Sequence, residues 1–286
     1  MTYSTYISKL RIKLHDLSTL ERNRWDGDAT TTLFQTSKRP IKDGSYLIKV
    51  DGVEKTENTD YTLDKDLGLL TFVSAPASGS DNVEMTYRAY ILRDDEYLEL
   101  INNAIDHFRW KFWKEADDTS SITTTKDQYE YDLSSLTGIL YVVNCWYKSS
   151  SSSTIWEAIQ GLTNWKYLTR QKKLFVNPTF STSSLPMKIR YLKSFTKGTA
   201  ISDDLDIPDE WLLPYEYYIK ARYYENRVPE KVNETAAVTT MPSYTPAQVM
   251  LNIVEYYDKK AEEVAKKIAP TFPTMPVKQL HDGVSL

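Results

Sequence analysis

The hydrophobic period of the sequence changes twice within the first 116 residues, and this change most limits the folds that the chain can adopt. Residues 4–20 carry apolar side chains at spacings of four, four and three, which predicts a one-sided helix: Tyr6, Leu10, Leu14 and Leu17. From about Leu33 to Leu92 the period falls to two, which is typical of half-buried strands. The helical period then returns at residues 94–116. A β module therefore interrupts a pair of helices.

The strands of this module are predicted by alternation and by turn residues. Apolar residues alternate with polar ones at 46–50 and at 83–87. Asp51 and Gly52 are typical of a hairpin turn, and a second turn is expected at 65–68. Such a unit closes on itself as a small antiparallel sandwich or barrel. Because its two ends then lie close together, it can be inserted between helices.

The helix predicted at 94–116 begins with acidic residues that suit the positive end of a helix dipole. Its buried stripe is expected to be Tyr97, Ile101, Ala104, Ile105, Phe108 and Phe112. Trp110 and Trp113 fall off this stripe. They either pack under the next β segment or face a partner.

A second β region is expected from about Ile122 to Phe195, with strands around 129–133, 139–145, 174–176 and 187–191. The five serines at 149–153 predict a solvent-exposed loop. Trp156 and Trp165 lie in this region, where tryptophans more often close a core than stack on sugars.

The last third is predicted to be helical. One helix follows DIPDEW and buries a face through Trp211, Tyr215, Tyr218 and Ile219. The final helix starts with a capping box at Thr245, Pro246 and Gln248, and three Glu–Lys pairs at i,i+4 are expected on its polar face: Glu255–Lys259, Glu262–Lys266 and Glu263–Lys267.

The tail after the final helix contains three prolines in its first eight residues and cannot form a compact unit alone. It still carries apolar residues: Phe272, Met275, Val277 and Leu280. Terminal segments of this kind often become ordered by adding to a neighbouring chain. The alternative is a disordered tail.

Composition argues against several function classes. A net charge of -4 disfavours a general nucleic-acid binder, which needs clustered Lys and Arg. The single cysteine, Cys145, lies in an apolar run and is expected to be buried.

We find no signal peptide and no apolar run of about 20 residues, so synthesis in the cytoplasm without a membrane partner is expected. The 21 tyrosines and 7 tryptophans indicate either large interfaces or a β-rich core.

No motif for chemistry stands out. The three histidines are far apart, and metal, nucleotide and nucleophile motifs are missing, so no catalytic residue, metal or cofactor is expected. The acidic run DDLD at 203–206 offers carboxylates for a divalent cation, but capping of the following helix is the favoured interpretation. A glycan hydrolase would need two of these carboxylates, such as those of Asp203, Asp204 and Asp206, to converge in a cleft.

Several segments in this order resemble the head-to-tail adaptor proteins of tailed bacteriophages, also called head-completion or connector proteins. They are the short N-terminal helix ending near RW, DDEYLELINNAIDHF, YEYDL, ILYVV, NWKYL, KLFVNP, MKIRYL and DIPDEWLLPYEYYIKARYY. The module VDGVEKTENTDYTLDKDLGLLTFVSAPASGSDNVEMTYRAY also resembles β insertions of phage structural proteins. The resemblance covers most of residues 4–268, and none of its motifs is catalytic.

The resemblance implies a non-enzymatic virion protein of the head–tail neck. About twelve copies would form a ring under the portal protein, contact a downstream neck or tail protein and let genomic DNA pass without specific binding. The expected fold class is α+β: a helical bundle core with an antiparallel β region and an inserted small β-sandwich or barrel module. The expected segments are an N-terminal core helix (1–25), the inserted module (26–92), the adaptor core (93–268) and an extended tail (269–286).

The site residues expected on this interpretation are interface residues. Phe272, Met275, Val277 and Leu280 would anchor the tail to the portal or to a neighbouring subunit, and Trp211 and Tyr215 would lie near the ring contact. A tail or baseplate protein that binds a receptor or a carbohydrate is the alternative.

Overall fold

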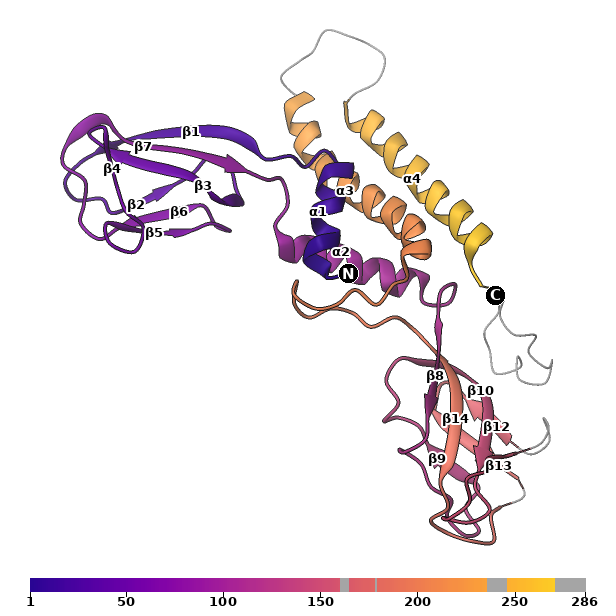
Figure 1. Cartoon of the computed structure of the whole chain (residues 1–286). Helices are drawn as coiled ribbons and strands as arrows, with labels where there is room; N and C mark the ends of the chain where they lie inside the picture. Colours follow the sequence, from indigo (N-terminus) through magenta and orange to yellow (C-terminus); the bar gives the residue numbers. More distant parts are fainter. Residues whose placement is uncertain (160–164, 178, 236–245, 271–286) are drawn as a thin grey trace. The chain divides into compact units, whose positions relative to one another are not determined.

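The computed structural model describes residues 1–159, 165–177, 179–235 and 246–270 (Figure 1). The chain divides into two compact units, Met1–Ile101 with Gly198–Leu205 and Asn102–Lys197 with Asp206–Leu286. In the described residues, fourteen strands form four antiparallel sheets, accompanied by four α-helices and one short 3-10 helix.

The first unit begins with helix α1 (Tyr3–Lys13), which is capped by the Thr2 side chain. The helix predicted over 4–20 is too long, because His15 adopts a left-handed backbone conformation with φ 55° and the chain leaves the helical path there. Strand β1 (Thr19–Gly27) follows, and Leu17 is exposed. Strand β1 thus begins inside the segment 1–25 that was predicted as an N-terminal helix, while the other predicted segment boundaries stay predictions.

Two sheets enclose one apolar core in this unit. The first sheet has the order β1-β7-β3-β4 and the second the order β2-β6-β5. The remaining strands are β2 (Leu33–Gln35), β3 (Ile41–Val50), β4 (Val53–Glu54), β5 (Tyr61–Asp64), β6 (Leu69–Phe72) and β7 (Gly79–Ala89). The core cluster contains residues of both sheets, including Phe34, Ile48, Phe72, Met85 and Tyr87.

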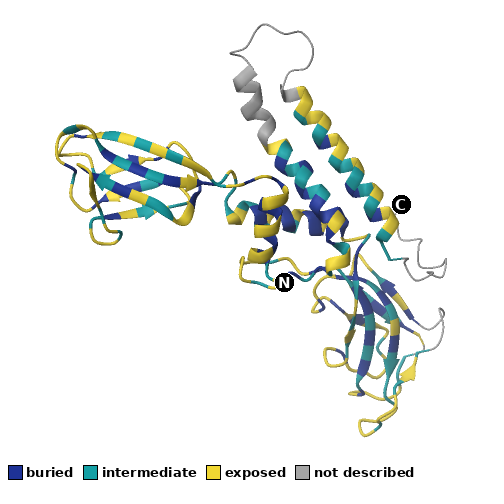
Figure 2. Cartoon of the chain, turned by 45° about the horizontal axis from the view of Figure 1, so that its top comes forward, coloured by how far each residue is buried: buried dark blue, intermediate teal, exposed yellow. Residues whose placement is uncertain are grey.

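The strands predicted at 46–50 and 83–87 are confirmed. Ile48 pairs with Met85 and Val50 with Val83, and all four are buried. Asp51 and Gly52, with φ of 51° and 78°, form the expected two-residue turn between β3 and β4. Figure 2 shows buried and exposed positions alternating along the long strands of this module.

A buried charged cluster lies where the module joins the helices. The Arg11 guanidinium donates to Asp16 Oδ2 (2.6 Å), to the Leu92 carbonyl (2.8 Å) and to Asp94 Oδ1 (2.8 Å). It also lies 3.9 Å from the centre of the Tyr90 ring. Arg11 therefore bonds to chain segments on both sides of the module.

The Asp16 carboxylate completes this cluster. It is fully buried and accepts hydrogen bonds from the Ile91 backbone N–H (2.7 Å) and the Tyr97 hydroxyl (2.9 Å). Tyr97 belongs to helix α2 (Asp94–Phe108). Because a buried carboxylate must be paired and hydrogen-bonded, these contacts determine how the chain enters and leaves the module.

The second unit contains another pair of sheets, with the orders β11-β10-β14-β8 and β12-β13-β9. The strands are β8 (Lys114–Asp118), β9 (Glu130–Asp132), β10 (Ile139–Tyr147), β11 (Glu157–Ala158), β12 (Trp165–Leu168), β13 (Lys173–Val176) and β14 (Met187–Lys193). The strands predicted around 129–133, 139–145, 174–176 and 187–191 are confirmed. The helix predicted to reach residue 116 ends at Phe108 instead, because Lys114–Asp118 pairs with β14.

Three helical elements follow: η1 (Asp209–Trp211), α3 (Leu212–Thr235) and α4 (Pro246–Ile268). Helices α3 and α4 lie side by side in Figures 1 and 2. Helix α4 begins at Pro246 as predicted, whereas Thr245 of the capping box lies outside the described residues. Glu255 pairs with Lys259 (2.7 Å) as expected.

The other two predicted pairs on α4 are wrong. Glu262 pairs with Lys111, and Glu263 pairs with Lys260 (3.4 Å) instead of Lys267. Glu262 therefore stabilises the contact between α4 and the chain segment after α2, a role that its position on the polar face did not indicate.

The predicted helical bundle core is wrong. Most of the elements in the described residues are antiparallel strands in four sheets, and each pair of sheets encloses its own cluster of buried side chains. Helix α4 packs on α3 in a two-helix hairpin. No helix within the described residues combines the length and apolar character that a membrane crossing needs.

Candidate functional site

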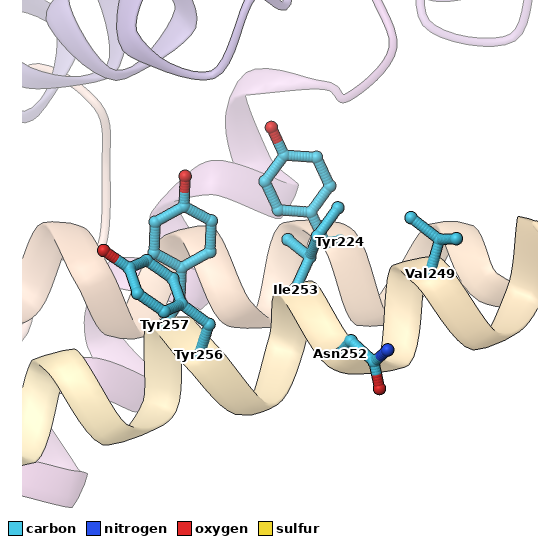
Figure 3. A pocket seen from close by; sticks show the side chains of 6 residues that line it. All are labelled: Tyr224, Val249, Asn252, Ile253, Tyr256 and Tyr257. Carbon is cyan, nitrogen blue, oxygen red and sulfur yellow. The ribbon is translucent and has the colours of Figure 1, made fainter.

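A tyrosine-lined groove runs along the α3–α4 hairpin. It encloses about 310 Å³ and is lined by Tyr224 of α3 and by Val249, Asn252, Ile253, Tyr256 and Tyr257 of α4. We call it the hairpin groove. Figure 3 shows the rings of Tyr256 and Tyr257 at one end, Tyr224 and Ile253 in the middle and Val249 at the other end.

The walls of the hairpin groove are held in place by stacked rings. Tyr257 lies parallel to Tyr224, with 5.9 Å between ring centres and 6° between planes, and it also stacks on Tyr217 at 6.1 Å. Burial raises the pKa of the Tyr257 hydroxyl above its ordinary value of 10.0. Stacked pairs of this kind stabilise packing beyond the area that they bury. The groove therefore has a rigid aromatic wall.

Charged groups support the same contact from its edges. Arg222 of α3 donates to both carboxylate oxygens of Asp258 on α4, at 2.7 and 2.6 Å. The Lys220 ammonium lies 5.7 Å from the Tyr217 ring centre and 5.6 Å from that of Tyr257. These two cations fix the spacing of the helices without entering the groove lining.

Part of the apolar surface of the groove is exposed among the residues that the structure describes. Tyr256 is 56% exposed and Val249 is 46% exposed. Leu251, also on α4, is 47% exposed but does not line the groove. Large aromatic and aliphatic side chains that are exposed around a hollow are typical of a surface that binds a partner.

The predicted ring-contact residues lie in a buried aromatic cluster near the start of α3. Tyr215 is fully buried, with its ring centre 5.1 Å from that of Phe108 and 5.6 Å from that of Phe112. Trp211 is half-buried and packs on Phe112 (5.6 Å) and Phe195 (5.7 Å). Tyr215 has no exposed surface in the chain, so its contribution here is to packing. A ring contact near these positions stays a prediction.

The predicted tail anchors Phe272, Met275, Val277 and Leu280 lie outside the described residues.

The side chains of Asp203 and Asp206 in the acidic run bond to residues other than those of the helix that follows. Asp203 accepts hydrogen bonds from the backbone N–H groups of Thr199 (2.7 Å) and Ala200 (2.9 Å), and these bonds lower its pKa. Asp206 pairs with Lys114 and accepts a bond from the Thr196 N–H (3.0 Å). The short helix η1 starts after Pro208 without a side-chain cap. The predicted capping role is therefore wrong.

Neither a metal cluster nor a reactive thiol accompanies the groove. Among the residues that the structure describes, no group of three or more His, Cys, Asp or Glu side chains is arranged to hold a metal ion. Cys145 is buried as expected, and burial raises the pKa of its thiol. A buried thiol with a raised pKa is a packing residue and not a nucleophile.

The tryptophans divide between core and surface. Trp165 is buried in the core of the second pair of sheets, and Trp113 packs against Leu140 and Leu192. Trp110 is 45% exposed. Trp146 is half-buried on β10 with the cations of Lys188 and Arg190 at 5.3 and 5.5 Å from its ring centre.

Sequence patterns missed the hairpin groove. Its residues come from two helices that are far apart in the sequence, and Tyr224, Val249 and Tyr256 do not belong to the stripes that predicted buried faces. The available signal was the adjacent pair Tyr256–Tyr257, in which one ring must lie off the buried stripe.

Comparison with protein-family models finds no family that matches this chain, and comparison with curated protein sequences finds no similar protein.

Proposed function

We propose that this chain is a non-enzymatic structural protein of a tailed-phage virion, a head-to-tail adaptor in the neck. About twelve copies form a ring that docks on the portal protein, extends the DNA channel and receives a downstream neck or tail protein. The order of sequence segments that resembles phage adaptors motivates the proposal. The observation that supports it best is the hairpin groove, an exposed apolar surface with a rigid aromatic wall and no metal cluster in the described residues.

A subunit of a ring must present two different, complementary surfaces to its neighbours. The hairpin groove supplies one such surface, and the apolar tail supplies a candidate for the other. A net charge of -4 also suits a channel through which DNA slides, because few cations are available to hold phosphates.

The experiment is imaging of the chain with a purified portal ring. Full-length protein and a version ending at Ile268 are each mixed with the ring and examined by mass photometry and negative-stain electron microscopy. We expect the full-length chain to decorate the portal at one end and the shortened chain to fail. Absence of portal decoration by the full-length chain under conditions where it is folded contradicts the adaptor proposal.

A receptor- or carbohydrate-binding tail protein is the second candidate, because of the tryptophans on the second pair of sheets. Trp156 is half-buried with the Lys148 ammonium 5.0 Å from its ring centre, and Trp146 lies near two further cations. Exposed tryptophan faces bind sugar rings, but cations already lie close to these rings. Saccharide binding on a glycan array that is lost in Trp156→Ala, without portal decoration, favours this candidate.

A further inference from the structure

The prolines of the tail are spaced as in a polyproline II helix, which is a kind of ligand that aromatic grooves bind. Pro270, Pro273 and Pro276 follow each other at intervals of three residues. A polyproline II helix has three residues per turn, so in that conformation these prolines share one edge and Phe272 and Met275 share the next. Aromatic-lined grooves recognise such segments because the ligand is already stiff and loses little entropy on binding.

The hairpin groove has the properties that this ligand requires. Three tyrosine rings line it, and Tyr224 and Tyr257 are held parallel at 5.9 Å. Along α4 the lining extends from Val249 to Tyr257, which corresponds to about 12 Å of helix. The segment 270–276 spans about 19 Å as polyproline II. The ligand is therefore long enough to cover the whole groove.

The distance between the end of α4 and the groove determines which copy the prolines reach. Helix α4 ends at Ile268, so Tyr257 lies about 20 Å and Val249 about 30 Å back along the helix from Pro270. A tail that turned back on its own hairpin would use about six residues to reach Tyr257. The proline repeat would then end where the groove begins. The prolines of one chain can fill the groove only of another chain.

We infer that the segment 270–276 of one copy binds as a polyproline II helix in the hairpin groove of a second copy. Each copy has one groove and one tail, so the contact is head-to-tail and generates a closed ring or an open filament. The inference rests on the proposed function, because the ring that this contact closes is the proposed adaptor ring. It adds to that function which segment of one copy meets which surface of the next copy.

A labelled tail peptide tests the binding directly. The probe is a fluorescein-labelled peptide of residues 269–283, and the receptor is the full chain carrying Pro273→Ala and Pro276→Ala, so that the tails of other receptor copies do not compete. We expect saturable binding by fluorescence polarisation. Adding Tyr256→Ala and Val249→Ala to the receptor lowers the affinity about tenfold or more, since exposed anchors at an interface carry much of its binding energy.

Leu251→Ala is the matched control for the receptor, because Leu251 is equally exposed on α4 and lies outside the lining. We expect its affinity for the peptide to change less than about twofold. A peptide with Pro273→Ala and Pro276→Ala binds more weakly than the native peptide. Equal binding to the groove variant and to the Leu251→Ala control overturns the inference, as does a lack of binding to any receptor.

A mixing experiment tests that the contact forms between copies. The full-length tail variant (Pro273→Ala, Pro276→Ala) and the full-length groove variant (Tyr256→Ala, Val249→Ala) are examined by sedimentation velocity at concentrations above the measured peptide Kd. Each variant alone is expected to be monomeric, and an equimolar mixture forms one-to-one complexes through the intact groove of one and the intact tail of the other. A mixture that stays monomeric overturns the contact between copies.

Portal imaging separates this inference from the proposed function. Peptide binding and mixed complexes without portal decoration support the tail–groove contact and contradict the adaptor. Portal decoration without peptide binding supports the adaptor and overturns the tail–groove contact.

Discussion

Two arginine–aspartate pairs hold different parts of this protein together in different ways. Arg11 and Asp16 are 9% and 0% exposed at the side chain, whereas Arg222 and Asp258 are 28% and 37% exposed. A buried charge depends on its partner because water cannot replace it, but an exposed charge is solvated when its partner is lost. The junction of the β module therefore relies on electrostatics, while the α3–α4 hairpin relies on its stacked tyrosines.

Arg11→Met is expected to cause the largest loss in the free energy of unfolding. This substitution leaves the Asp16 carboxylate buried without a cation, and the cost of such an unpaired charge is about 3–5 kcal/mol. Urea unfolding monitored by circular dichroism measures the loss. A cost below about 1 kcal/mol would mean that the cluster does not hold the junction.

A smaller loss in the free energy of unfolding is expected from Arg222→Met. This substitution also removes an arginine–aspartate pair, but the pair is more exposed to solvent. Asp258 stays in contact with solvent and the stacks of Tyr257 with Tyr217 and Tyr224 remain. We expect a loss of about 1 kcal/mol or less in the same unfolding assay. A loss as large as that of Arg11→Met would remove the contrast between the two regions.

The smallest expected effect is a pH-dependent contribution of Glu262 to the stability of the fold. Partial burial opposes its charged form, but hydrogen bonds from Lys111 and His107 outweigh burial and lower its pKa below the usual 4.5. A lowered pKa in the folded state stabilises the fold above pH 4.5, and this contribution is lost as the pH falls through the folded value.

We therefore expect Glu262→Gln to lower the unfolding free energy at pH 7 by less than about 1 kcal/mol. The difference from the native chain should shrink in thermal melts as the pH drops below 4.5. Glu263→Gln is the control, because it removes the same charge from the same helix. A difference that grows on acidification contradicts the role of Glu262.

Prediction from sequence succeeded where burial alternates strictly. On neighbouring strands of one sheet, Ile48 pairs with Met85 and Val50 pairs with Val83. The turn at Asp51 and Gly52 needs a left-handed backbone. Such strands leave a clear period of two in the sequence.

Prediction failed where strands are polar and where elements are distant in sequence. Strand β1 places Arg22 and Arg24 on its exposed side and the half-buried Glu21, Asn23 and Trp25 on the other, so no apolar alternation marks it. Strand β8, with the sequence KEADD, exists because β14 offers it hydrogen-bond partners. The hairpin groove depends on which helix packs against α4, and a single-helix pattern contains no such information.

The pairing at the base of the β module has a consequence for how the gene can be altered. Thr19 at the start of β1 is paired directly with Ala89 at the end of β7, so their Cα atoms are separated by about 5 Å. A few-residue linker could replace everything between them, and a foreign domain with adjacent termini could be grafted at the same point. The module can thus be gained, lost or exchanged as a cassette without changing the path of the remaining chain.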